Sequence, residues 1–308
     1  MKVLRDIQHL PPLNRPLVTI GTFDGVHLGH KQVLSQLVQE ARKNGVDSLL
    51  ITFDPHPRQA LGLGEIALLS LLEEKLNLLS ETGLDYVLVI PFTLAFSQKS
   101  AIEFIHEYLL ESLTISGIFL GYDHKFGNKR EGSVVLLKKE LEPMGIKVRE
   151  IPAHAVDSIT ISSTKIRNFL IQGNAAEANQ LLGYAYSFSG KVGHGEKRGR
   201  TLGFPTANIE VEDPSKLLPG RGVYAVRCGI GKSAHFGMMN IGQRPTVGGM
   251  HQTIEVYVLN FNRDIYGEIV EITVLEKIRD ERSFSSLEAL KDQLTRDEAF
   301  VRTYCIDG

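Results

Sequence analysis

The sequence contains no tryptophan and only two cysteines, Cys228 and Cys305, among its 308 residues. Two cysteines so far apart give no disulfide framework and suit a reducing compartment, which excludes a small disulfide-stabilised secreted scaffold. No apolar run approaches the roughly 20 residues that a membrane-spanning helix needs, and residues 1–6 lack the apolar core of a signal peptide. We therefore expect a cytoplasmic protein without a membrane partner.

An excess of one charge is also missing, because 34 Lys and Arg stand against 36 Asp and Glu, a net charge of −2. A chain without a basic field has no general attraction for nucleic acid, so we expect small-molecule partners, and self-association is left open. The remaining composition is ordinary for a globular protein, with 43% hydrophobic and 23% charged residues. A chain of 308 residues has room for two domains.

Residues 1–183 alternate between short apolar runs and stretches with helical spacing. The apolar runs have the length of buried strands and lie at residues 16–20, 47–53, 86–90, 115–120 and 146–151. Helical spacing first appears over residues 32–42, and further helices are expected between the later strands. This alternation predicts an α/β, Rossmann-like domain with a parallel, doubly wound sheet.

Residues 184–308 follow a different pattern, in which strand-like segments come at short spacing with turns between them. These segments lie at residues 187–192, 206–209, 222–226, 235–241, 253–260 and 268–275. Closely spaced strands with period-two alternation predict a small, mainly β domain built as an antiparallel barrel. A final helix is expected over residues 285–303, capped by Ser285 or Ser286.

The stretch from Gly21 to His30, Gly-Thr-Phe-Asp-Gly-Val-His-Leu-Gly-His, lies where the first strand turns into the first helix. Glycines let the backbone approach a ligand closely, and the free amides at a helix start attract anions. His27 and His30 are three residues apart, a spacing that can aim two imidazoles at one phosphate chain. Two other interpretations are possible. The stretch could be a plain helix start with two incidental histidines, or the histidines could be zinc ligands. The distant cysteines and the missing His-Glu-x-x-His pattern disfavour zinc.

This motif resembles the signature of the nucleotidyltransferase superfamily, in the form found in bacterial bifunctional riboflavin kinase/FAD synthetases. The resemblance implies that His27, His30 and Arg167 act in adenylyl transfer. Arg167 belongs to a second stretch, Ser162-Ser-Thr-Lys-Ile-Arg167, that is similar to the second superfamily signature. The resemblance further implies nucleotide or flavin binding by Gly21, Phe23, Asp24, Gly29, Asp123, Ser163 and Thr164. His124, after Asp123, stands where the family usually has an aromatic residue.

The richest stretch of the second half runs from Gly193 to Asn208, Gly-His-Gly-Glu-Lys-Arg-Gly-Arg-Thr-Leu-Gly-Phe-Pro-Thr-Ala-Asn. Its glycines and basic residues suit a loop that covers phosphates, although they also fit a solvated basic hairpin. Gly-Phe-Pro-Thr-Ala-Asn resembles the riboflavin kinase signature. The resemblance implies ATP binding by Gly195, Arg198, Gly203, Pro205, Thr206 and Asn208. Within this set it implies that Thr206 and Asn208 hold Mg²⁺, a cation that prefers few oxygen ligands from protein.

Glu255 lies on the strand that corresponds to the one carrying the family's catalytic glutamate. The resemblance implies that Glu255 accepts the proton of the ribityl hydroxyl as that hydroxyl attacks ATP. Without the resemblance, a glutamate on an alternating strand is an ordinary solvent-facing side chain. Tyr257 and Asn260 stand where many relatives have His and Asp. Neither residue is the proposed base, so these differences affect the expected substrate contacts rather than the proton transfer.

The sequence thus predicts a bifunctional enzyme of flavin cofactor synthesis that uses ATP, Mg²⁺ and the flavins riboflavin, FMN and FAD. Residues 1–183 are expected to form the adenylyltransferase domain, and residues 184–308 the riboflavin kinase domain. Two alternatives stay open at this point. One is a nucleotidyltransferase acting on another phosphate acceptor, and the other is a non-catalytic flavin- or RNA-binding protein.

Overall fold

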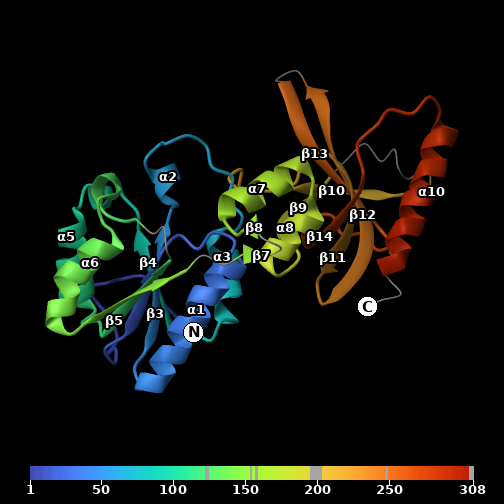
Figure 1. Cartoon of the computed structure of the whole chain (residues 1–308). Coiled ribbons are helices and arrows are strands. Elements are labelled where there is room, and N and C mark those ends of the chain that lie inside the picture. The colour runs from blue at the N-terminus through green and yellow to red at the C-terminus, as the bar shows by residue number, and fades with distance from the viewer. Residues whose placement is uncertain (122–124, 153–154, 157–158, 195–202, 247–248, 305–308) are drawn as a thin grey trace. The chain divides into compact units, whose positions relative to one another are not determined.

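The computed structural model describes residues 1–121, 125–152, 155–156, 159–194, 203–246 and 249–304. Its residues pack into two compact units, Met1–Ser163 and Thr164–Gly308 (Figure 1). Each unit is described by itself below. The predicted functional boundary after residue 183 lies inside the second unit and stays a prediction.

The first unit is built on a six-stranded sheet with the order β1-β4-β3-β2-β5-β6, in which every neighbouring pair is parallel. The strands are β1 (Lys2–Leu4), β2 (Leu17–Ile20), β3 (Ser48–Asp54), β4 (Tyr86–Pro91), β5 (Gly117–Gly121) and β6 (Lys147–Ile151). The chain moves outward from β2 in one direction to β3 and later in the other direction to β5. Ligands of open α/β sheets bind at such a reversal, outside the carboxyl ends of the strands.

Helices cover both faces of this sheet. The helical segments are α1 (Leu28–Asn44), α2 (Pro57–Ala60), α3 (Leu72–Ser80), α4 (Leu94–Ser97), α5 (Ala101–Phe104), η1 (Ile105–Ser112), η2 (Asn128–Arg130), α6 (Val134–Leu141) and η3 (Glu142–Met144). One apolar core forms between the sheet and α1 with α3, and a second forms between the sheet and α5, η1 and α6. A two-stranded ribbon, β7 (Ala155–Val156) with β8 (Ile159–Thr160), precedes the second unit. The predicted parallel, doubly wound sheet is confirmed.

The second unit is a closed barrel with the strand order β10-β13-β12-β11-β14-β9, in which β9 also pairs with β10. Its strands are β9 (Ser187–Gly193), β10 (Thr206–Glu210), β11 (Gly222–Ile230), β12 (Ser233–Thr246), β13 (Gly249–Val258) and β14 (Ile269–Arg279). All pairings are antiparallel, so the predicted barrel is confirmed.

The helices described alongside the barrel strands are α7 (Ser163–Gln172), α8 (Ala175–Leu182) and α10 (Leu287–Tyr304). α8 is joined to β14 by Asn179, whose side-chain amide donates to the carbonyl oxygens of Val274 at 2.9 Å and Leu275 at 3.2 Å. α10, the predicted terminal helix, packs against β11 and β12. The Ser286 hydroxyl caps it by accepting the amide proton of Ala289 at 3.1 Å.

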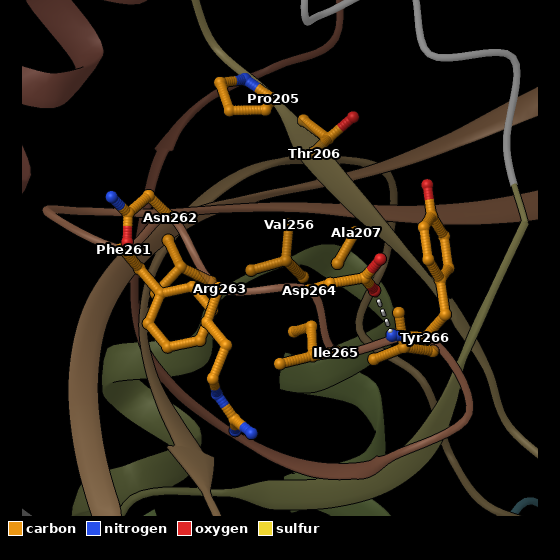
Figure 2. Close-up of a pocket in the computed structure, with 12 residues that line it drawn as sticks. Pro205, Thr206, Ala207, Val256, Phe261, Asn262, Arg263, Asp264, Ile265 and Tyr266 are labelled. Atoms are coloured by element: carbon orange, nitrogen blue, oxygen red, sulfur yellow. Dashed lines mark hydrogen bonds between the residues drawn. The ribbon is translucent and has the colours of Figure 1, made fainter.

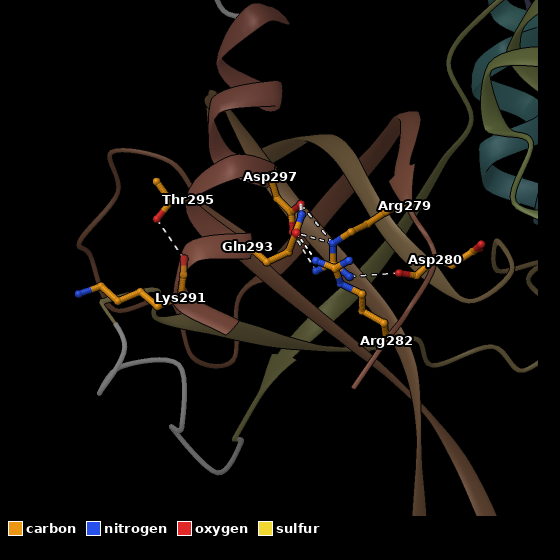
Figure 3. A network of polar contacts seen from close by, with 7 residues as sticks. All are labelled: Arg279, Asp280, Arg282, Lys291, Gln293, Thr295 and Asp297. Atoms are coloured by element: carbon orange, nitrogen blue, oxygen red, sulfur yellow. Dashed lines mark hydrogen bonds and ion pairs between the residues drawn. The ribbon is translucent and has the colours of Figure 1, made fainter. Parts of the chain in front are cut away.

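A buried ion pair fixes α10 to the end of β14 (Figure 3). The Asp297 carboxylate is only 1% exposed and accepts from the Arg279 guanidinium, with Nε to Oδ1 at 3.1 Å and Nη2 to Oδ2 at 2.8 Å. Gln293 donates to the same carboxylate at 2.7 Å and accepts from Arg282. Two parallel hydrogen bonds to one carboxylate fix orientation as well as distance, so this pair sets how the helix lies on the barrel.

Candidate active sites

The turn between β2 and α1 has an unusual backbone. Phe23 (φ 48°), Gly25 (φ 79°) and Val26 (φ 34°) all lie in the left-handed region. Glycine takes this conformation freely, but a β-branched residue such as Val26 does so at a cost. Val26 is fully buried, and Phe23 is nearly so, which is how the surroundings hold the turn in place. Strain of this kind is concentrated at functional sites, so the turn is the first candidate site.

Asp24 anchors this turn to the segment before α3. Its carboxylate is buried and accepts the backbone protons of Leu69 at 3.2 Å and Ser70 at 3.0 Å. The Ser70 hydroxyl in turn accepts the amide proton of Gly25 at 2.9 Å. The structure thus gives Asp24 a structural contact, and its predicted nucleotide-binding role stays a prediction.

His27 and His30 form a stacked pair at the start of α1. Their ring centroids are 3.6 Å apart with an angle of 14° between the planes. His27 is the N-cap of the helix, because its Nδ1 accepts the backbone proton of His30 at 3.3 Å. Neutral His27 therefore carries its own proton on Nε2. A Cβ on Gly29 would lie 3.3 Å from the His27 ring, so the glycine leaves room for this imidazole.

His30 is held neutral by its surroundings. Burial of the ring, together with the nearby His27 and Lys75, lowers its pKa well below the usual 6.5. The ring also packs against Phe23, with centroids 4.6 Å apart. Its Nδ1 is buried and has no hydrogen-bond partner among the described residues. A buried polar nitrogen without a partner is uncommon and marks this ring as a candidate ligand contact.

The first unit brings together seven of the predicted site residues around this turn: Gly21, Phe23, Asp24, His27, Gly29, His30 and Ser163. The Ser163 hydroxyl donates to the carbonyl oxygen of Asp24 at 3.0 Å, a contact within the first unit. Thr164 and Arg167 follow on α7 in the second unit, and Asp123 and His124 lie outside the described residues.

The second candidate site is a polar row on the outer face of the barrel. The register pairs Asn208 of β10 with Glu255 of β13, and Glu255 with Asn240 of β12. Directly opposed residues share a face, so the three side chains lie side by side. Their strand neighbours Ile254 and Val256 are buried on the opposite face, in the barrel core.

Thr206 joins this row from one step along β10. Its hydroxyl donates to Glu255 Oε2 at 3.3 Å. For the side-chain amide of Asn208, the structure records no hydrogen bond with another described residue. A hydroxyl, an amide oxygen and a carboxylate that converge in this way are the hard oxygen ligands that Mg²⁺ prefers. The described residues therefore fit the predicted cation.

The motif that carries Thr206 is anchored by its phenylalanine. Phe204 is buried beneath α10 in a cluster with Met238 and Val301. Its ring also packs edge-on against the ring of Tyr257, with centroids 5.1 Å apart. Gly203 has a φ of 85°, a conformation that favours glycine at this bend. Gly195 and Arg198, also predicted to bind ATP, lie outside the described residues.

A pocket of about 360 Å³ opens next to Thr206 and reaches Val256, on the face of the strands opposite Glu255 (Figure 2). One side is formed by strand residues that include Pro205, Thr206 and Val256, and the other by the loop of residues 261–266. This loop is braced by Asp264, whose carboxylate accepts the amide proton of Tyr266 at 3.0 Å. The pocket combines apolar walls with several polar side chains, which could fix the orientation of a small molecule.

Comparisons with known proteins agree with both sites. Residues 11–165 match the family model described as FAD synthetase, and residues 182–305 match the model described as riboflavin kinase. The chain belongs to the bifunctional riboflavin kinase/FMN adenylyltransferase family. The family resemblance noted in the sequence is thereby confirmed.

Similar proteins carry the same name across the whole chain. The chain is 39% identical over 308 residues to the bifunctional riboflavin kinase/FMN adenylyltransferase of Escherichia coli K12, covering 99% of this chain and 98% of that protein. It is 40% identical over 291 residues to the Listeria monocytogenes protein, covering 94% and 92%.

A solved structure described as a macrolide-efflux protein from Streptococcus pneumoniae has a TM-score of 0.89 and 31% identity, with 98% of each chain covered. The structure of the present chain has, within the residues that it describes, no helix long and apolar enough to cross a membrane.

Two features beside the candidate sites of this structure were missed by sequence reasoning. One is Lys75, which lies under the first turn although its helical spacing alone does not distinguish it from a surface lysine. The other is the pocket loop, residues 261–266, which carries Asn, Asp and two aromatic residues but matches no pattern with a mechanism. The turn residues in this loop were the only available signal.

Proposed function

We propose that this chain makes FMN and then FAD in two reactions at two separate sites. The barrel site phosphorylates riboflavin with ATP, and the β2–α1 turn transfers AMP from a second ATP to FMN. The observation that carries this proposal is that each candidate site lies in its own compact unit and within its own family match.

At the barrel site, the ribityl 5′-hydroxyl of riboflavin attacks the γ-phosphorus of ATP, and ADP leaves. Glu255 accepts the hydroxyl proton, since its carboxylate is partly exposed on the outer face and flanked by the polar row. A general base must lie within hydrogen-bond reach of the proton that it takes. The hydrogen bond from Thr206 to Oε2 orients the Glu255 carboxylate.

Thr206 and Asn208 are the residues that would hold Mg²⁺ at this site, through their side-chain oxygens. When bound with ATP, the cation neutralises the charge that develops on the phosphates. The neighbouring pocket suits the adenosine of this ATP, because Pro205 and Thr206 belong both to the riboflavin kinase signature and to the pocket wall.

At the turn site, a phosphate oxygen of FMN attacks the α-phosphorus of ATP. A new phosphorus–oxygen bond forms, the bond to the bridging oxygen breaks, and pyrophosphate leaves. His27 and His30 donate hydrogen bonds to the phosphate oxygens. The role of Arg167 on α7 stays a prediction from the family resemblance. The start of α1 also favours phosphate at this turn, because the positive end of a helix dipole attracts anions.

The flavin ring of FMN needs an aromatic surface near the carboxyl ends of the strands. The rings of Phe53, at the end of β3, and Phe92, after β4, pack edge-on with centroids 5.5 Å apart. The ring of Phe96 contacts both. All three rings are partly exposed. This aromatic cluster is the surface on which we place the acceptor's ring system.

Product analysis tests the proposal directly. The purified chain is incubated with riboflavin, ATP and Mg²⁺, and riboflavin, FMN and FAD are separated over time. FMN that appears first and is converted to FAD supports both activities and their order. FMN without FAD contradicts the turn site, and FAD from supplied FMN without any riboflavin phosphorylation contradicts the barrel site.

A further inference from the structure

Lys75 of α3 is a buried lysine that the proposed chemistry does not use. Its side chain is only 7% exposed. The ammonium donates to the Thr22 carbonyl oxygen at 3.2 Å, to the Thr52 hydroxyl at 3.2 Å and to the Phe53 carbonyl oxygen at 3.5 Å. Lysine is almost never buried without partners, and here its three protons meet three acceptors.

The three acceptors lie at the carboxyl ends of two neighbouring strands. Thr22 follows β2, while Thr52 and Phe53 are near the end of β3. The Thr52 hydroxyl also donates to the Thr22 carbonyl at 3.2 Å, so the two strand ends are joined directly as well as through the ammonium. Thr22 is the last residue before the left-handed Phe23, whose ring packs on His30.

The ammonium is also a buried charge close to the histidine pair. Burial lowers the pKa of Lys75, while Asp24 of the turn and Asp54 at the end of β3 raise it. The charge of Lys75 acts with His27 to lower the pKa of His30. Lys75 is therefore coupled to His30 both through the backbone of the turn and through its charge.

We propose that Lys75 is a positioning residue for adenylyl transfer: its ammonium joins the carboxyl ends of β2 and β3 and thereby fixes the turn that carries His27 and His30. This inference rests on the proposed role of that turn in FAD formation. Displacement of a reacting group by about 1 Å can cost roughly 100-fold in rate, so a support of this kind has a measurable effect.

The test compares Lys75→Met, which removes all three hydrogen bonds and the charge, with Lys75→Gln, which keeps an amide donor of shorter reach. Lys43→Met, at an exposed lysine of α1, is the matched control. We expect Lys75→Met to lower kcat for FAD formation from FMN by roughly 100-fold, with a much smaller change in KM for ATP. Lys75→Gln is expected to fall between Lys75→Met and the unaltered chain, and Lys43→Met to match the unaltered chain.

Two further readouts separate positioning from a loss of folding. Histidine ring NMR should show a higher pKa for His30 in Lys75→Met, because a neighbouring positive charge has gone. Amide spectra should stay dispersed, and riboflavin phosphorylation should be unchanged. A folded Lys75→Met chain with unaltered kcat overturns the inference. If Lys75→Met does not fold, a folded Lys75→Gln chain with unaltered kcat overturns it equally.

His30→Ala, measured in parallel, distinguishes this inference from the proposed function. Loss of FAD formation in His30→Ala, with full activity in the folded Lys75 variants, overturns only the role of Lys75. Full FAD formation in His30→Ala overturns the proposed turn site and the role of Lys75 that rests on it.

Discussion

The two candidate sites position their polar side chains by different means. On the barrel, Asn208, Glu255 and Asn240 lie in a row because three paired strands place opposed residues on one face. In the first unit, His27 and His30 meet because a strained turn ends in a helix whose N-cap is one of the two histidines. Regular strand pairing thus aligns the polar row of the barrel, whereas an irregular turn brings the two histidines together.

This difference determines what each site depends on. The barrel row follows from strand register, and register is secured by many ladder hydrogen bonds. The turn depends on a few individual contacts, such as Asp24 with the Ser70 backbone and Lys75 with Thr22. We therefore expect the turn site to be the more sensitive to single substitutions outside the substrate-contacting residues.

The largest effect is expected at the barrel site. Glu255→Gln should lower FMN formation by roughly 10²–10⁴-fold, the usual contribution of a general base. FAD formation from supplied FMN should be unchanged, because it takes place at the turn. Initial rates with riboflavin and with FMN measure the two activities. Glu271→Gln, at an exposed carboxylate of β14, is the control, and equal loss of both activities in Glu255→Gln would contradict the two-site assignment.

The next effect concerns stability of the second unit alone. Asp297→Ala removes the buried carboxylate that holds the partly buried Arg279, so we expect the free energy of unfolding to fall by up to about 3 kcal/mol. Denaturant unfolding, followed by hydrogen exchange in peptides from β11 and β12, measures this loss. Asp292→Ala, at an exposed position of the same helix, should have little effect. Destabilisation that reached α1 equally would show that the two units do not unfold separately.

At the turn site, His27→Ala and His30→Ala should each lower FAD formation from FMN by roughly 10²–10³-fold, as loss of a phosphate-stabilising donor does. Riboflavin phosphorylation should be unchanged. His106→Ala, at an exposed histidine of η1, is the control for removing an imidazole. Full FAD formation in both variants would remove the histidine pair from the chemistry.

The smallest effect is a pH dependence confined to the first unit. The pKa of His30 is lower in the folded state than in the unfolded chain, so the unfolded state binds more protons at mildly acid pH. Neutral His30 therefore contributes its full share to the free energy of unfolding above about pH 6.5. This contribution falls by at most about 1.4 kcal/mol per pH unit as the pH drops toward the pKa of His30 in the folded state. Hydrogen exchange of α1 amides between pH 7 and 5 measures this slope. His30→Gln should flatten it, and an unchanged slope would assign the pH dependence to another group.

The comparison also explains which features the sequence could predict. The joint role of Thr206 and Asn208 was predicted from the family resemblance, and their shared face of β10 agrees with period-two alternation. The fold class followed from the spacing of the strands. The left-handed conformations of Phe23 and Val26 could not be predicted, because non-glycine residues rarely adopt them without tertiary support.

Burial was the other property that local pattern did not determine. Lys75 is polar and lies on an amphipathic helix, a combination that usually means a solvent-facing side chain. Its burial depends on Thr22 and Phe53, which become its neighbours only when β2 and β3 pair. The short strand β1 (Lys2–Leu4) was missed for a similar reason, since its identity comes from its pairing with β4.

Closure of the barrel has a consequence for insertions and deletions. Since β9 pairs with both β14 and β10, no strand of this barrel has a free edge along which it could slide. Loss of one residue within β10 would therefore turn Thr206 and Asn208 toward the core and bring Ala207 and Ile209 to the outer face. Changes in length are confined to the connections, which makes the loop of residues 261–266 the place where related chains can vary pocket size while the alignment of Asn208 with Glu255 is kept.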